Sequence, residues 1–242
     1  MDRSDSVLGD PVGQLPYWEM QIEPDNCSVV AEMMIIRQFG VDIDQKEANF
    51  LASLYGWYCG GGGGTSFDDI GKLMNKYGVP SRTRLGVSKK EMRSDLINEL
   101  MAGHGVIVGI RSPQASESYE SNPYAAGRVG QTPANHAVIL TGIDVSDPEE
   151  PKAIVNDPGY EDGAGKEWSL DDFIDACWNG CRFYVATDEP LPRDTDKAYP
   201  FIVGDIQKVY DLLVSGAPMQ SSPSFDHRAT YMNKAFSNMD SI

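Results

Sequence analysis

The chain has 242 residues, 41% of them hydrophobic and 10% aromatic, which is enough to bury one substantial core. Its 36 acidic and 20 basic residues give a formal net charge of -16 without a cluster of Lys and Arg, so electrostatics oppose nucleic acid as a partner. The N-terminus lacks the pattern of a signal peptide, and no run approaches the roughly 18 apolar residues of a membrane span, so we expect a soluble, cytoplasmic protein.

The first half of the chain is predicted to be helical. Apolar residues recur at helical spacing in four segments, which cover residues 25–39, 44–56, 66–78 and 88–103. The first helix begins at or beside Cys27. Gly56 and Gly78 close the second and third segments, as expected for glycines that end a helix in the left-handed conformation. Ser88 and Glu91 have the spacing of a capping box at the start of the fourth.

The second half is predicted to form mostly strands. Short runs of β-branched and aromatic residues lie at residues 105–110, 136–143, 152–157 and 181–187. A short helix over residues 169–180 precedes the last run. Helices followed by mostly consecutive strands predict an α+β domain, in which an N-terminal helical layer packs on a mostly antiparallel sheet.

The composition changes near residue 190, so we expect a main domain at residues 1–190 and an appendage at residues 191–242. Residues 201–216 have the pattern of an amphipathic helix, and residues 225–239 that of a second helix after a linker. The tail is either an accessory helix with a loose end or a docking segment for a protein partner, and the sequence leaves both interpretations open.

The four cysteines, Cys27, Cys59, Cys177 and Cys181, are too few for a disulfide framework, so free thiols are the simpler interpretation. Cys177 and Cys181 would lie one turn apart on a helix. A zinc site needs two further ligands at suitable spacing, and the sequence offers none. We therefore expect no bound metal.

A run of glycines at residues 60–64 raises the question of a phosphate-binding loop. Such a loop ends in Gly-Lys followed by Ser or Thr, whereas this run continues with Thr65 and Ser66 and has no lysine. Nucleotide binding is therefore not expected. The run is either a loop that flanks a substrate cleft or a plain flexible connection.

Cys27 is the candidate nucleophile, because the start of a helix favours a thiolate through the helix dipole and unsatisfied N–H groups. Alone, Cys27 is more simply explained as a buried apolar side chain. A general base nearby is needed to support its role as a nucleophile. Among the three histidines, His104 lies in a turn and His227 in the tail. His136 opens an apolar strand, where a rigid element would hold its ring as a base; the alternative is a strand-capping histidine.

A third group would orient the imidazole by accepting its other N–H. Asp157 and Asn156 end the next strand, and strands paired as a hairpin bring these ends together. Asp157 is the first choice and Asn156 the second, unless Asp-Pro-Gly is only a turn closed by its own side chain. The oxyanion of acyl transfer needs donors, which the backbone N–H of Cys27 and the side-chain amide of Gln21 can supply.

Together these residues carry a family resemblance. Gln-x5-Cys at a helix start, a histidine before the apolar strand that ends Thr-Gly-Ile-Asp, and then Asn-Asp-Pro resemble the C39-like peptidase family of bacterial proteins, with the papain-like cysteine peptidase fold. The resemblance covers about residues 17–187, including the glycine run. It implies Gln21 as oxyanion-hole donor, Cys27 as nucleophile, His136 as general base and acid, and Asp157 as orienter, with no cofactor.

Two departures limit what the resemblance implies. Ser28 follows the nucleophile where many members have Gly, which concerns local packing only. The best understood members are domains of ABC exporters that cut leader peptides after Gly-Gly, whereas this chain has neither a membrane segment nor an ATPase motif, so that substrate is not carried over.

We therefore expect a cysteine peptidase that acts on a peptide or protein substrate. Two alternatives use the same fold. One is a deamidase or acyl transferase that modifies a partner protein, and the other is a non-catalytic binding protein that recruits a partner through its C-terminal helices.

Overall fold

The computed structural model describes residues 6–111, 134–180 and 182–192. The two predicted tail helices lie outside these residues, so the boundary near residue 190 and the role of the tail stay predictions. In the described part of the chain, no helix combines the length and the apolar character that crossing a bilayer requires.

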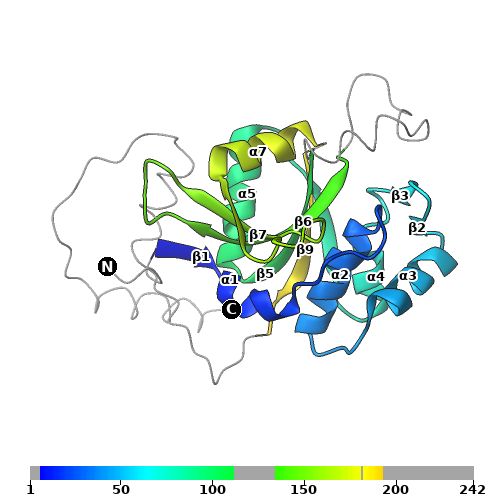
Figure 1. The fold of residues 1–242 in the computed structure, drawn as a ribbon. Helices are drawn as coiled ribbons and strands as arrows, with labels where there is room; N and C mark the ends of the chain where they lie inside the picture. The colour runs from blue at the N-terminus through cyan, green and yellow to red at the C-terminus, as the bar shows by residue number, and fades with distance from the viewer. Residues whose placement is uncertain (1–5, 112–133, 181, 193–242) are drawn as a thin grey trace, which may run out of the picture.

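One antiparallel sheet runs through the centre of the molecule (Figure 1). Its strand order is β4-β9-β5-β6-β7-β8, and β1 pairs with β6. The strands are β1 (Val7–Gly9), β4 (Ser81–Leu85), β5 (His104–Ile110), β6 (His136–Asp144), β7 (Lys152–Asn156), β8 (Lys166–Ser169) and β9 (Phe183–Pro190). The predicted strands correspond to β5, β6, β7 and β9, so the prediction of an antiparallel sheet is confirmed.

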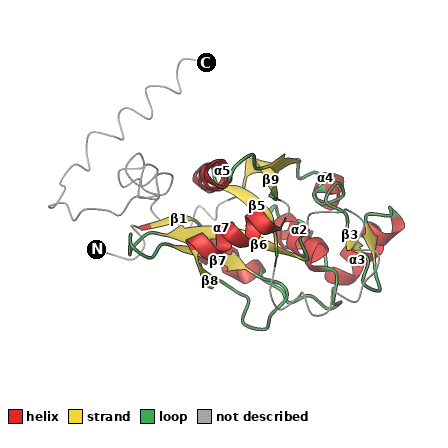
Figure 2. Ribbon diagram, turned by 90° about the horizontal axis from the view of Figure 1, so that it is seen from above, coloured by secondary structure: helices red, strands yellow, loops and turns green. Residues whose placement is uncertain are grey.

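The helices are α1 (Pro11–Gln14), the 3-10 turn η2 (Leu15–Tyr17), α2 (Cys27–Gln38), α3 (Gln45–Leu54), α4 (Lys72–Lys76), α5 (Lys89–Met101) and α7 (Leu170–Asn179). A separate hairpin pairs β2 (Tyr58–Cys59) with β3 (Gly64–Thr65). Figure 1 and Figure 2 agree that α2, α3, α4 and this hairpin lie together at one end of the described structure, with β1 toward the other.

Side chains of the central strands alternate between two cores. Ile107 of β5 packs with α2, α3 and α4, whereas its neighbours Val106 and Val108 pack with α5 and α7. The predicted α+β class is therefore confirmed. The structure adds a second helical layer, because α5 covers the face of the sheet opposite to α2.

Helix α2 is central, because it contacts β5 and β6 on one side and α3 and α4 on the others. Every residue from Ser28 to Ile36 is buried. A close-packed core resists the displacement of such a helix. Its burial therefore fixes the position of Cys27, the first residue of α2.

One detail of the helix prediction is wrong. The segment 66–78 forms only α4, because residues 67–71 form turns and Gly71 adopts a φ of 96°, a conformation that favours glycine. The predicted helix over residues 169–180 corresponds to α7, which carries the buried Cys177, whereas Cys181 lies outside the described residues.

Glu32 places a carboxyl group inside the core around α2. It is 2% exposed and accepts the backbone N–H of Met74, in the first turns of α4, over 3.1 Å. Burial raises the pKa of Glu32 from 4.5 to about 7, although hydrogen bonds from the α4 backbone oppose this shift. Glu32 therefore changes its charge near neutral pH.

We predict that Glu32 makes the fold less stable as the pH rises. A carboxyl with a higher pKa in the folded state loses its proton first in the unfolded chain, so stability falls between pH 4.5 and about 7. Glu32→Gln keeps an acceptor for Met74 and removes this loss, which is on the order of 3 kcal/mol. Urea unfolding at several pH values measures it, with the exposed Glu91→Gln as control. An unchanged pH slope in Glu32→Gln would contradict the prediction.

Candidate active site

Cys27 opens helix α2, as the sequence predicted, and is half-buried. The preceding residue, Asn26, fixes this helix start. Its side-chain amide donates to Asn49 of α3 over 3.1 Å, and its carbonyl accepts the N–H of Val30 over 3.0 Å. The first N–H groups of a helix have no acceptor within the helix. Cys27 therefore lies among unpaired donors at the positive end of a rigid helix.

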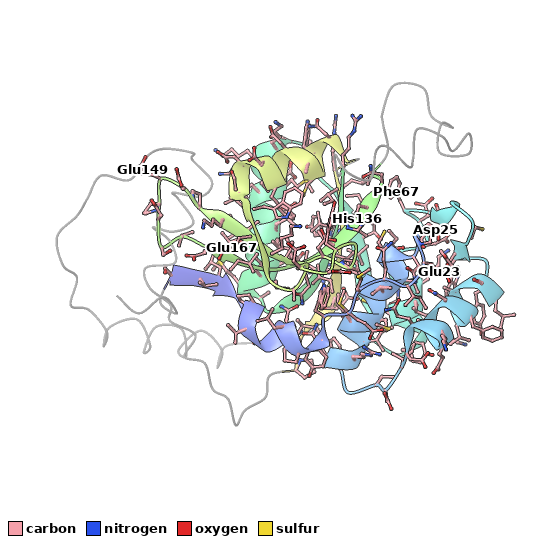
Figure 3. All side chains as sticks on the ribbon, in the orientation of Figure 1. Glu23, Asp25, Phe67, His136, Glu149 and Glu167 are labelled. Atoms are coloured by element: carbon pink, nitrogen blue, oxygen red, sulfur yellow. The ribbon has the colours of Figure 1, made fainter. Side chains whose placement is uncertain are left out.

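His136 and Asp157 meet at one edge of the β6–β7 pair. These strands are antiparallel with Ile139 opposite Asn156, so the start of β6 lies next to the residue that follows β7. His136 Nε2 lies 2.6 Å from Asp157 Oδ1, and the side chain of Cys27 acts on the same imidazole, because it contributes to the raised pKa of His136. In Figure 3, His136 of β6 lies on the side of the sheet that is nearer to Glu23 and Asp25. The structure thus brings three predicted residues together.

The surroundings of His136 favour its charged form. Burial alone would lower the pKa of His136, but hydrogen bonds to Asp157 and Cys27, together with the negative charges of these groups, raise it from 6.5 to about 10. A histidine that is protonated at neutral pH can hold the proton of the neighbouring thiol. The two side chains then form a thiolate–imidazolium pair.

The side chain of Asp157 makes the contacts that both interpretations of the Asp-Pro-Gly sequence require. Asp157 Oδ1 accepts from His136 and also from the backbone N–H of Gly159, over 2.9 Å, so the side chain closes its own turn. The backbone N–H of Asp157 donates to the carbonyl of Gly163 over 2.8 Å. These bonds fix the orientation of a carboxylate that is fully buried.

Asn156, the second choice for the orienting group, is engaged elsewhere. Its amide donates to the carbonyl of Gln14 over 3.0 Å, and its side-chain oxygen accepts the N–H of Gly165 over 3.0 Å. It therefore joins the loop after β7 to the N-terminal segment, while Asp157 faces His136.

Sequence reasoning missed Gly159 and Tyr160. A Cβ atom at Gly159 would lie 2.9 Å from His136 Cε1 and 3.1 Å from His136 Nε2, so only glycine lets the loop pass this close to the imidazole. The Tyr160 ring stands edge-on to the imidazole, with 6.5 Å between the ring centroids. A Pro-Gly pair in the sequence predicts a turn, but it does not predict that the turn packs against the imidazole of His136.

Gln21 lies beside the same loop. Its backbone N–H donates to the carbonyl of Pro158 over 2.8 Å, which ties it to the turn that carries Asp157. Its side-chain Nε2 donates to the carbonyl of Glu23 over 2.8 Å, and a primary amide has a second hydrogen to donate. The structure therefore places Gln21 next to the loop of Asp157, with one amide hydrogen already bonded locally.

The glycine run forms the tip of the β2–β3 hairpin, and this tip is fastened close to the helix start. Asp25 accepts the hydroxyl of Tyr58 over 2.6 Å and the backbone N–H of Gly62. Burial and the bond to Asp25 raise the pKa of Tyr58 well above its usual range. The hairpin is therefore held beside the residues that precede Cys27. This position is the one expected for a loop that flanks the candidate site.

The other chemical groups of the described residues show no competing centre. No group of three or more His, Cys, Asp and Glu side chains in these ranges is arranged to hold a metal ion. His104 lies 2.6 Å from Glu99 and 3.2 Å from Arg82, so it belongs to a polar network that joins β4, α5 and β5. His227 lies outside the described residues.

The sequence matches the model of the Peptidase_C39 like family over residues 14–186. No curated protein sequence matches it. A structure described as a C39-like peptidase from Bacillus anthracis is 16% identical, with a TM-score of 0.52 over 78% of this chain and 100% of that one. The peptidase domain of Streptococcus ComA, a bifunctional ABC transporter, is 14% identical, with a TM-score of 0.46 over 72% and 97% of the two chains. The similarity to the Bacillus anthracis structure shows the fold of this chain, which is papain-like as predicted.

We predict that Gly159→Ala displaces the imidazole. The new Cβ atom would stand 2.9 Å from His136, so the loop or the ring has to move and the bond to Asp157 weakens. We expect Cys27 to react at least about tenfold more slowly with iodoacetamide at neutral pH, as measured by mass spectrometry. The control is Ala164→Ser, an exposed position of the same loop. A wild-type rate in Gly159→Ala would show that the close approach has no consequence.

We also predict that Asp157→Asn lowers the pKa of His136. Asparagine keeps the size of the side chain but loses the charge that helps to raise this pKa to about 10. A raised histidine pKa stabilises the fold below pH 6.5, and this contribution is lost between pH 6.5 and about 10, so in the variant the loss is smaller and is complete at a lower pH. NMR titration of the ring protons measures the shift, with His104 as internal control. The same His136 titration in both proteins would refute the prediction.

Proposed function

The chain belongs to the Peptidase_C39 like family, and we propose that it is a cysteine peptidase that hydrolyses peptide amides with Cys27, His136 and Asp157. The observation that carries this proposal is the buried imidazole of His136, which is bonded over 2.6 Å to Asp157 and whose pKa is raised by Asp157 and Cys27. A nucleophile, a base and a group that orients the base are the parts that acyl transfer requires.

In the first half of the proposed reaction, the thiolate of Cys27 attacks the carbonyl carbon of a peptide bond. The imidazolium of His136 gives its proton to the nitrogen of the leaving amine as the carbon–nitrogen bond breaks. The acyl group stays on Cys27 as a thioester. Asp157 holds the ring in place and stabilises its positive charge.

The attack places a negative charge on the carbonyl oxygen, which needs donors that are already in position. The backbone N–H of Cys27, at the start of α2, is one such donor. The second hydrogen of the Gln21 amide is the other donor in this proposal. Its support is the position of Gln21, whose backbone is bonded to Pro158 next to the orienting aspartate.

In the second half, neutral His136 takes a proton from a water molecule, and the resulting hydroxide attacks the thioester carbon. The acyl group leaves as a carboxylic acid, and Cys27 and His136 regain their starting protonation. These groups are sufficient for amide hydrolysis without a cofactor. We assign this function to the main domain at residues 1–190, because the family match covers residues 14–186.

We predict that Cys27→Ala abolishes both peptide hydrolysis and labelling by a low concentration of iodoacetamide near neutral pH. The thiolate would be lost, while the Ala side chain fits the half-buried position without a clash. Cys59→Ala is the matched control, since Cys59 is exposed and lies on the β2–β3 hairpin. Equal labelling of the Cys27→Ala variant and the wild type would remove the case for an activated thiol.

Mass spectrometry of a treated protein substrate then identifies the reaction. New termini that depend on Cys27 support peptidase activity. A gain of about one dalton at Gln or Asn without new termini identifies a deamidase instead. Full biological function of the Cys27→Ala protein would identify a binding protein and overturn the proposal.

A further inference from the structure

The N-terminal segment of residues 14–21 runs along the end of β7 and the loop after it, and hydrogen bonds join the two. The carbonyl of Gln14 accepts the amide of Asn156 over 3.0 Å. Further along, the indole Nε1 of Trp18 donates to the backbone carbonyl of Asp157 over 2.8 Å. These two contacts, and the bond from the Gln21 N–H to the next carbonyl, occur in the same order along both stretches of chain.

We propose that Trp18 is a positioning residue of this site, which holds the orienting Asp157 in register with the oxyanion donor Gln21. It acts through the backbone carbonyl of Asp157, which accepts its indole N–H. This inference rests on the proposed function, because it assigns a role relative to the residues of the proposed mechanism.

The hydrogen bonds of the two peptide groups that flank Asp157 explain why the indole N–H of Trp18 matters for the orientation of this side chain. The N–H of Asp157 is bonded to the Gly163 carbonyl, and its carbonyl is bonded to Trp18. The residue after it is Pro158, which has no N–H to contribute to the turn. Because both peptide groups that flank the Asp157 Cα are held, its carboxylate keeps one direction toward His136.

Trp18 itself is anchored to the helix that carries the nucleophile. Its side chain packs on the core around α2. The next residue, Glu19, forms an ion pair of 2.5 Å with Arg37 of α2, and its backbone N–H contacts the sulfur of Met34. The N-terminal segment therefore links α2, which carries Cys27, to the turn that carries Asp157.

A second tryptophan offers a matched control. Trp168 on β8 also packs against a core, but its indole Nε1 is buried without a hydrogen-bond partner in the described part of the chain. Trp→Phe at either position removes a similar ring volume. Only Trp18→Phe also removes a hydrogen bond to the site.

The experiment measures the rate at which iodoacetamide alkylates Cys27 as a function of pH, resolved by mass spectrometry so that the other thiols do not interfere. The charged groups that act on His136 are Cys27 and Asp157. A looser Asp157 stabilises the imidazolium less, so the thiolate–imidazolium pair forms at higher pH. Circular dichroism melting reports the folded fraction of each variant.

We expect Trp18→Phe to react about fivefold more slowly than the wild type near pH 6, per folded molecule, which corresponds to the loss of one ordinary hydrogen bond. The rate near pH 9 changes little, because at that pH an ordinary thiol forms a thiolate without a basic partner. Trp168→Phe keeps the wild-type profile. If Trp18→Phe does not fold, Trp18→Met, whose flexible apolar side chain has no donor, takes its place.

A pH profile of Trp18→Phe that matches the wild type overturns the proposal. So does a rate that falls by the same factor at every pH, or by the same amount as in Trp168→Phe, because either result describes a purely structural role. The probe does not depend on peptide hydrolysis. If the wild type reacts with iodoacetamide but cleaves no peptide, the proposed peptidase function fails while the test of Trp18 remains valid.

Discussion

A fully buried carboxylate has to be compensated by hydrogen bonds or by an opposite charge. Asp157 meets this condition at Oδ1, through His136 and the backbone N–H of Gly159, whereas its Oδ2 is buried without a hydrogen-bond partner among the described residues. The pairing of β6 with β7 and the turn after β7 supply both partners at one edge of the sheet. The groups that would orient the general base are therefore also the groups that make the buried charge tolerable, so the chemistry and the local stability depend on the same contact.

Helix α2 imposes the second constraint. A nucleophile has to be held in place, and α2 achieves this by being buried on nearly all sides from Ser28 onward. The same burial surrounds Glu32 and raises its pKa to about 7. The helix that fixes Cys27 thus contains an ionisable group that most core helices avoid. Its charge is tolerated only because the start of α4 donates backbone N–H groups to it.

The sequence predicts those elements whose signal is local. The periodic helices and the apolar central strands were predicted, and the capping bond from the Glu91 N–H to the Ser88 hydroxyl is present over 3.1 Å. Strand β4 was missed because it lies at the edge of the sheet and its first four residues, Ser81 to Arg84, are all polar, so no apolar alternation marks it. Trp18 was missed because its partner lies 139 residues away in the chain, and no local pattern encodes such a contact.

The choice between Asp157 and Asn156 marks where prediction from sequence stops. Hairpin geometry places both residues near His136, and either side chain can accept an N–H. Adjacent residues at the end of a strand point to opposite sides, however, so at most one of them can face the imidazole. The structure directs Asn156 to the carbonyl of Gln14 and Asp157 to His136. The loop therefore needs both residues in this order, because one ties the loop to the N-terminal segment and the other provides the charge.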